Sequence, residues 1–164
     1  MQKVAHKKLS DTLLTIITQN PYVHEIIQSD PFPEIRDWYL AAGCITQSVW
    51  NHLSGRPITE GIEDYDLIYF DPDLSKDREA QCRERIGRLF SHLPIHIDVV
   101  NEARVHEWFH EYFFRTIRPY TSCEDAISSW SPCSAVGVTC KKGKIGICAP
   151  LGLEDLFFFY DAPT

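Results

Sequence analysis

The 164-residue sequence has no long apolar run. Its longest strongly apolar stretch, Leu156–Tyr160, is far shorter than the roughly 20 residues needed to cross a membrane. The basic start of the chain is followed by an apolar segment interrupted by threonine, without the continuous core and cleavage site of a secretory signal. We therefore expect a protein that is neither membrane-bound nor secreted and that is located in the cytoplasm.

Cysteine pairs with the spacing of metal or redox motifs are also missing. The six cysteines, at positions 44, 82, 123, 133, 140 and 148, form no Cys-x-x-Cys and match no standard zinc-binding spacing. In a chain without a secretion signal we expect buried free thiols, although a disulfide between two of them stays open.

Positive charge is in deficit. Lys and Arg number 16 and Asp and Glu number 23, which gives a formal net charge of −7. An acidic surface argues against broad, sequence-independent binding to nucleic acid or anionic lipid, but it leaves room for a local basic groove. With 44% hydrophobic and 24% charged residues the composition is typical of a globular protein, and the length predicts a single domain over residues 1–164.

The hydrophobic pattern predicts an α+β fold, a mixed β-sheet with packed helices. Helical spacing over residues 9–17 and 23–27 predicts two helices, which Asn20-Pro21 divides and Asp30-Pro-Phe-Pro33 ends. Strand-like and helix-like segments then alternate over 38–42, 45–53, 62–70, 75–90, 95–100 and 103–114. Thr121 and Glu124 predict a capped short helix, Lys-Lys-Gly predicts a hairpin joining 136–140 to 144–149, and a last helix follows. The expected parts are N-terminal helices (1–33), a core (34–101) and C-terminal helices with the hairpin (102–164).

Three aspartates lie inside the two clearest strand segments. Asp64 and Asp66 are two residues apart, so their side chains point to the same face of the first strand. Asp98 lies in the middle of the second strand, among valine and isoleucine. If the strands are neighbours, the three carboxylates meet and repel one another unless a cation lies between them. Carboxylate oxygens suit Mg²⁺, so the pattern predicts a site for one or two such ions; an exposed strand edge with an ion-paired aspartate is the structural alternative.

A turn of small residues precedes these strands. The sequence Ala41-Ala42-Gly43-Cys44-Ile45-Thr46-Gln47 leads from a strand into a helix. Small side chains allow a triphosphate to approach the backbone, and a helix N-terminus offers free N–H donors. Thr46 and Gln47 could add side-chain donors. The same residues would also form an ordinary packing turn.

The order of these motifs resembles the nucleotidyltransferase superfamily of DNA polymerase beta, and more closely a family of small bacterial proteins classed as nucleotidyltransferases. The resemblance covers roughly 38–157. It is carried by Ala42-Gly43, Val49-Trp50-Asn51, Asp64-Tyr-Asp66-Leu-Ile-Tyr-Phe-Asp71-Pro-Asp73, Asp98-Val-Val-Asn101-Glu-Ala-Arg104-Val-His106-x-Trp108 and Ala149-Pro150-x-Gly152-Leu153-Glu154-Asp155-Leu156.

The resemblance implies a nucleotidyltransferase fold that transfers a nucleoside monophosphate from an NTP to an acceptor with Mg²⁺ or Mn²⁺. It implies that the metal-binding and catalytic residues are Asp64, Asp66 and Asp98, and that Gly43 and Cys44 lie at the nucleotide phosphates. The acceptor stays open between RNA, protein and a small molecule, as do the choice of NTP and the oligomeric state. The superfamily has Gly-Gly or Gly-Ser where this chain has Gly43-Cys44, so a hydroxyl donor is absent from the turn.

Three further interpretations remain, two of them about single motifs and one about the whole domain. Arg104 follows the third aspartate and either clamps a phosphate or pairs with a carboxylate. The string His106-Glu107-Trp-Phe-His110 spells the H-E-x-x-H zinc motif, for which Glu124 could supply a third ligand, and predicts a zinc hydrolase as the rival function. A third hypothesis is a nucleotidyltransferase-like domain that binds a nucleotide or a partner without catalysis.

Overall fold

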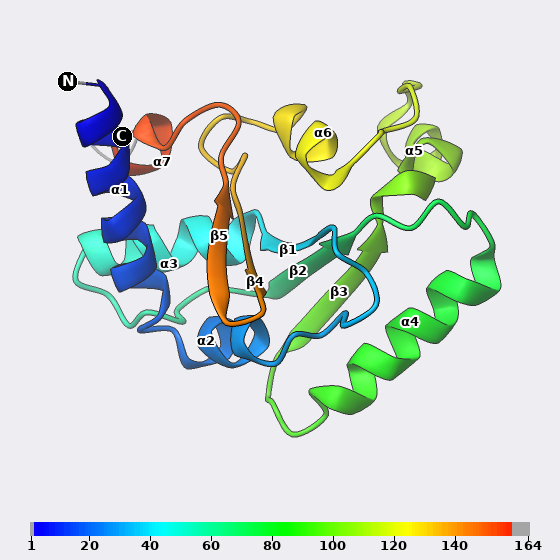
Figure 1. The fold of residues 1–164 in the computed structure, drawn as a ribbon, viewed down its shortest axis with the longest axis horizontal. Coiled ribbons are helices and arrows are strands. Elements are labelled where there is room, and N and C mark those ends of the chain that lie inside the picture. Colours follow the sequence, from blue (N-terminus) through cyan, green and yellow to red (C-terminus); the bar gives the residue numbers. More distant parts are fainter. Residues whose placement is uncertain (1, 159–164) are drawn as a thin grey trace.

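The chain forms one five-stranded β-sheet with helices around it, in a computed structural model that describes residues 2–158 (Figure 1). The α-helices of this part are α1 (Gln2–Ile17), α2 (Pro21–Gln28), α3 (Gly43–Leu53), α4 (Lys76–Leu89), α5 (Val105–Phe113), α6 (Cys123–Ser128) and α7 (Glu154–Phe158), with a 3₁₀ turn η1 (Glu102–Arg104). The strands are β1 (Trp38–Ala41), β2 (Asp64–Tyr69), β3 (His96–Asn101), β4 (Gly137–Lys141) and β5 (Lys144–Cys148). The predicted α+β fold class is confirmed. Met1 and residues 159–164 of the predicted domain lie outside the described residues.

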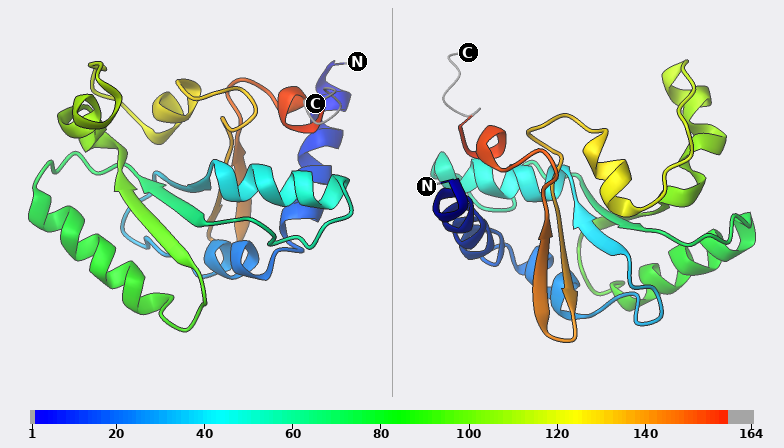
Figure 2. Two further views of the ribbon diagram at one scale, coloured as in Figure 1. Left: turned by 180° about the vertical axis from the view of Figure 1, so that it is seen from behind. Right: turned by 45° about the horizontal axis from the view of Figure 1, so that its top comes forward.

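The sheet has the strand order β3-β2-β1-β4-β5. β2 and β3 are parallel, because α4 connects them as a crossover, and the other neighbours are antiparallel. Figure 2 shows from behind that β2 and β3 lie side by side and that α4 runs along β3. The two strands that carry the aspartates are therefore neighbours, as the predicted aspartate cluster requires.

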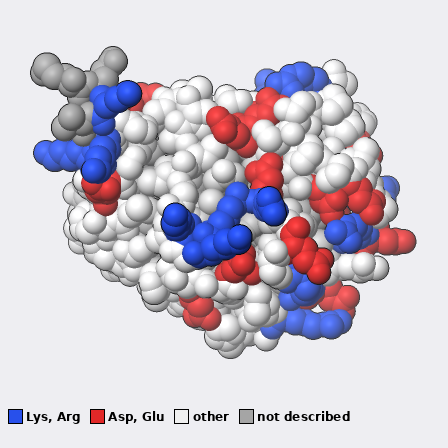
Figure 3. All heavy atoms as spheres, viewed as in Figure 1, with Lys and Arg blue, Asp and Glu red and all other residues white. Residues whose placement is uncertain are grey.

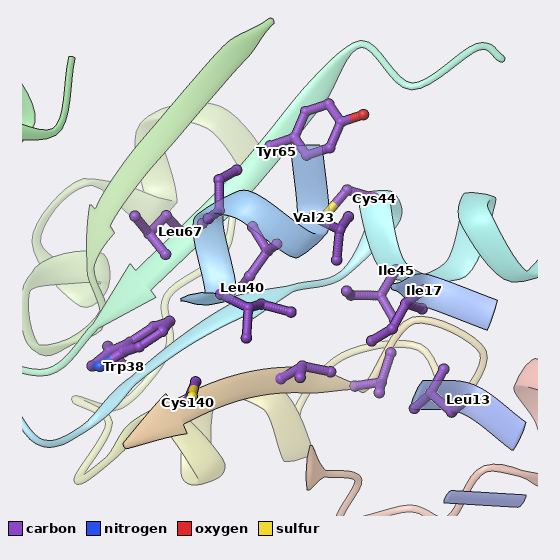
Figure 4. Packing of buried hydrophobic residues seen from close by; sticks show 14 of the residues in the cluster. Leu13, Ile17, Val23, Trp38, Leu40, Cys44, Ile45, Tyr65, Leu67 and Cys140 are labelled. Atoms are coloured by element: carbon purple, nitrogen blue, oxygen red, sulfur yellow. The ribbon is translucent and has the colours of Figure 1, made fainter. Parts of the chain in front are cut away.

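One face of the sheet carries the larger core. Side chains from β1 and β2, among them Leu40 and Leu67, pack against α1, α2 and α3 (Figure 4). Burial of each such aliphatic side chain contributes about 1.5–3 kcal/mol. Asn20 ties this face together, because its side chain accepts from two N–H groups of α2 while its amide donates to Ser48 and to the Tyr65 hydroxyl. The chain therefore breaks between two helices at Asn20, as the sequence predicts.

The opposite face has a smaller apolar cluster and is only partly covered. Ala41 and Ile68 of the sheet pack there against Cys123 and Ile127 of α6. Gly137 allows the close approach of β4, because a Cβ at this position would lie 2.9 Å from Cβ of Tyr39. The cluster reaches only part of β2 and β3, and the predicted site lies on this face.

The cap of α6 and the β4–β5 turn test two predictions for the C-terminal part. The prediction that Thr121 and Glu124 cap α6 is wrong: Ser122 is the N-cap, and its hydroxyl accepts from the Asp125 N–H at 3.0 Å. The predicted hairpin is confirmed, and its turn residues Lys142 and Gly143 both have positive φ, at 51° and 75°, as a two-residue hairpin turn requires.

The remaining general expectations concern thiols, charge and membrane spans. All six cysteines are free thiols. Acidic and basic side chains are interspersed on the face seen in Figure 3, with one group of basic side chains over the β4–β5 hairpin. Within residues 2–158, no helix combines the length and the apolar character that crossing a membrane requires.

Candidate active site on the β2–β3 strands

The parallel pairing of β2 and β3 brings the predicted aspartates to one place. Asp66 and Asp98 are direct Cα partners, and Asp64 is the partner of His96. Neighbouring strands are about 4.8 Å apart and alternate residues share a face, so all three carboxylates project from the partly covered face. The side chains of Asp64 and Asp98 are exposed and that of Asp66 is half-buried.

Asp66 has a clearly shifted pKa within this cluster. The pKa of Asp66 is raised from 3.8 to about 6, mainly by burial and in addition by the negative charges of Asp98 and Asp64. His96 acts in the opposite direction and lies 3.8 Å from Asp64. The cluster therefore carries more negative charge than its neighbours neutralise.

The donor set can be compared with the requirements of a divalent cation. Carboxylate oxygens are the ligands that Mg²⁺ prefers. A cation at this place would relieve the repulsion from Asp98 and Asp64, which adds to the effect of burial on the Asp66 pKa. In the side-chain positions of residues 2–158, no group of three or more His, Cys, Asp or Glu is arranged to hold a metal ion. The donor chemistry thus fits Mg²⁺, while a complete site requires the exposed carboxylates of Asp64 and Asp98 to turn toward Asp66.

The N-terminus of α3 lies beside this cluster, because Ala41 is the Cα partner of Asp66 on β1. Ala42 is the N-cap of α3 and has no side chain that could cap the helix. Its φ of 59° is rare for a residue other than glycine and marks a strained turn. Gly43 follows, exposed and with open space where a Cβ would be. The turn thus presents uncapped backbone N–H groups next to Asp66, the environment that favours an anion.

The side chains that follow Gly43 are engaged within the fold. Cys44 is fully buried, and its thiol donates to the Ala41 carbonyl at 3.5 Å. The Thr46 hydroxyl donates to the Cys133 carbonyl at 3.0 Å, and the Gln47 amide donates to Asn51 at 2.8 Å. At this turn, the backbone rather than these side chains faces the aspartates.

Arg104 is a central ion-pairing residue. Its guanidinium pairs with the buried Glu79 of α4 and with Glu107 at 2.9 Å, and its side chain is only 8% exposed. Of the two roles that the sequence left open for Arg104, the structure shows the pairing with carboxylates. The ion pair with Glu79 fastens η1 to α4, and both residues line the same cavity as Asp98.

Two cavities meet at the Asp66–Asp98 pair. The Asp66 cavity, of about 730 Å³, is lined by Asp66 and Ala42 and extends along α5 and the segment around α6. The Asp98 cavity, of about 570 Å³, is lined by Asp98 together with Lys76 and Arg83 of α4. Val100 and Trp108 line both cavities and separate them.

Glu102 is a residue of this site that the sequence analysis missed. It is 4% exposed, lines the Asp66 cavity, and forms no hydrogen bond or ion pair through its carboxyl with the described residues. Burial, followed by the charges of Asp66 and Glu79, raises the pKa of Glu102 to about 8. Asp98, Val100 and Glu102 are at alternate positions of the sequence. This spacing could have indicated that Glu102 lies on the same side of the sheet as Asp98.

The zinc motif is placed on α5. Glu107, which that interpretation requires as a base, is ion-paired with Arg104, and His110 is exposed. Nδ1 of His106 is buried without a hydrogen-bond partner among the described residues. Within residues 2–158, neither the histidines of α5 nor the aspartates of β2 and β3 belong to a group of three ligands arranged around a metal ion. The arrangement of ligands alone therefore does not decide between a zinc hydrolase and a nucleotidyltransferase.

Comparison with known proteins separates them. The profile of a family described as nucleotidyltransferase matches residues 32–164. A solved structure described as revealing a CCA-adding enzyme head domain is 27% identical and superposes with a TM-score of 0.71, over 90% of this chain and 74% of that chain. A search of curated proteins found no significant match. The match covers more than half of the chain, including the aspartates and the turn at Gly43, and this chain therefore belongs to the nucleotidyltransferase family.

Proposed function

We propose that the protein is a metal-dependent nucleotidyltransferase that transfers a nucleoside monophosphate from an NTP to an acceptor, within a single nucleotidyltransferase-like domain. The family supports nucleotidyl transfer in general. The observation that carries the finer proposal is the Cα pairing of Asp66 with both Asp98 and Ala41, because it joins a carboxylate pair to an uncapped helix N-terminus.

In this proposal the metal ligands are Asp64, Asp66 and Asp98, holding Mg²⁺ or Mn²⁺. When bound, the ion supplies charge neutralisation for the phosphates and for the oxygens that attack and leave. The backbone N–H groups of Gly43 and Cys44 bind the phosphates of the NTP. Asp98, which faces its own cavity, accepts the proton of the acceptor hydroxyl.

The remaining predicted nucleotide contacts have smaller roles. Thr46 and Gln47 hold the first turn of α3 in place through their hydrogen bonds and act as positioning residues. Arg104 holds η1 against α4 through its pairing with Glu79, at the wall of the Asp98 cavity. The Asp98 cavity, whose wall carries both basic and acidic side chains, is the place for the acceptor.

The test is incubation of the protein with each α-labelled NTP and Mg²⁺ or Mn²⁺, with release of pyrophosphate as the readout. Asp66→Asn should abolish release, because it removes charge at the centre of the cluster. The matched control is Asp11→Asn, which changes an exposed aspartate on α1 far along the chain from the site. Full pyrophosphate release by Asp66→Asn would contradict the assignment.

A second outcome of this experiment would favour the non-catalytic alternative. Cys44 provides no free side-chain donor at the phosphate turn, because its thiol is buried and bonded to the Ala41 carbonyl. Saturable NTP binding without pyrophosphate release, with each of the four NTPs and both metal ions, would identify a binding module. Stoichiometric zinc that is lost in His106→Ala would instead favour the hydrolase.

A further inference from the structure

An unpartnered acidic side chain points into the larger cavity of the site. Glu102 is only 4% exposed and lines the cavity, and its carboxyl forms no hydrogen bond or ion pair with the described residues, so its oxygens meet only the cavity. Buried polar groups are normally hydrogen-bonded, since leaving one unpaired costs about 1–3 kcal/mol. Glu102 lies on η1, between the β3 strand that carries Asp98 and the aromatic helix α5. This position suggests a carboxyl that is kept for a ligand.

The surroundings of Glu102 define the class of ligand. The cavity wall is rich in aromatic rings, contributed by Trp108, Phe109, Phe113, Tyr120 and Trp130. Such rings stack on planar heteroaromatic groups, at about 1–3 kcal/mol per nucleobase. A volume of about 730 Å³ is within the usual range for small-molecule sites. A flat ring system with hydrogen-bonding atoms on its edge fits both features.

The position of the cavity relative to the phosphate turn adds a third constraint. Ala42 and Asp66 line the same cavity as Glu102. An NTP whose phosphates lie at the N-terminus of α3 therefore has this cavity available for its nucleoside.

We propose that Glu102 is a specificity-determining residue that reads the hydrogen-bonding edge of the nucleobase of the NTP, while the aromatic wall stacks on the base. This inference rests on the proposed function, since it requires an NTP at the site. The carboxyl offers an acceptor oxygen next to a second oxygen that donates when it carries a proton. Burial favours the protonated form, in which Glu102 pairs with a base edge that places an N–H donor beside an acceptor.

The experiment measures equilibrium binding in the presence of Mg²⁺ for the wild type, Glu102→Leu and Glu102→Gln. The ligands are ATP, CTP, GTP, UTP and inorganic tripolyphosphate, which has no base. Tryptophan fluorescence reports binding, because Trp108 and Trp130 line the cavity. Glu124→Gln, an exposed glutamate of α6 outside this cavity, is the matched control, and thermal melting verifies that each variant is folded.

We expect the wild type to prefer some NTPs over others and Glu102→Leu to lose about tenfold in affinity for the preferred ones, the loss of one hydrogen-bonded pair. Binding of tripolyphosphate should not change. Glu102→Gln, whose amide keeps one donor and one acceptor, should retain the wild-type ranking. An unchanged ranking and affinity in folded Glu102→Leu would overturn the inference and leave the proposed function intact. Absence of binding for every NTP and for tripolyphosphate would overturn both.

Discussion

The pKa of Glu102 gives a quantitative prediction for protein stability. The pKa rises from 4.5 to about 8 in the folded chain, first because of burial and then because of the charges of Asp66 and Glu79. The folded protein therefore binds this proton more tightly than the unfolded chain does. The contribution of Glu102 to the free energy of unfolding is largest below pH 4.5 and falls as the pH rises from 4.5 to about 8.

The size of this effect follows from the same interval. One pKa unit corresponds to about 1.4 kcal/mol, so the full loss of stability is at most about 5 kcal/mol. Water that enters the cavity and small movements of its wall stabilise the carboxylate, and we expect about half of that limit, about 2–3 kcal/mol. Glu102→Gln cannot ionise and should not show this loss.

The assay is urea unfolding of the wild type and Glu102→Gln at pH 5 to 9, with EDTA and without nucleotide. Groups that titrate in both proteins largely cancel when the two free energies of unfolding are subtracted. The advantage of Glu102→Gln should be small at pH 5 and should grow by about 2–3 kcal/mol by pH 9. The exposed Glu124→Gln should show no such growth. A difference that stays constant or shrinks as the pH rises would refute the assigned burial of Glu102.

Three other substitutions test packing and pairing. Arg104→Met leaves the buried Glu79 carboxylate without its main partner and should lower the free energy of unfolding by about 3 kcal/mol, measured in urea. Cys44→Ser should bring no gain in nucleotide affinity by fluorescence titration, since its side chain faces the core, whereas a clear gain would show that a hydroxyl reaches the phosphates. Gly137→Ala places a methyl group 2.9 Å from Cβ of Tyr39 and should cost about 1–3 kcal/mol, seen as a lower melting temperature; an unchanged melting temperature would show that β4 can move away.

The sequence was most informative where one local rule decides the structure. Runs rich in β-branched and aromatic residues identified β2 and β3, and the two-residue spacing of Asp64 and Asp66 set their common face. The parallel register with Asp98 could only be stated as a condition, because strand pairing depends on contacts between residues far apart in sequence. The roles of the three aspartates in metal binding and catalysis stay a prediction.

The sequence was less informative for side chains whose partners are distant. Thr46 bonds to a carbonyl 87 residues later, so nothing near it in the chain indicated that its hydroxyl is engaged. The buried partner of Arg104 is Glu79, 25 residues earlier on another element. Glu102 was missed for a related reason: a glutamate after a strand is usually exposed, and its burial depends on how distant segments pack around it.

The separation of the two cavities by Val100 and Trp108 has a consequence for the order of events under the proposed activity. In the proposed reaction each cavity holds one reactant, the nucleotide beside Asp66 and the acceptor beside Asp98. Both molecules can then reside on the protein at once, so transfer can occur directly between them without a nucleotide held covalently by the chain. The volume beside Asp66 limits the size of the nucleotide, whereas β3 is the outermost strand of the sheet, and a bulky polymer could extend past it into solvent.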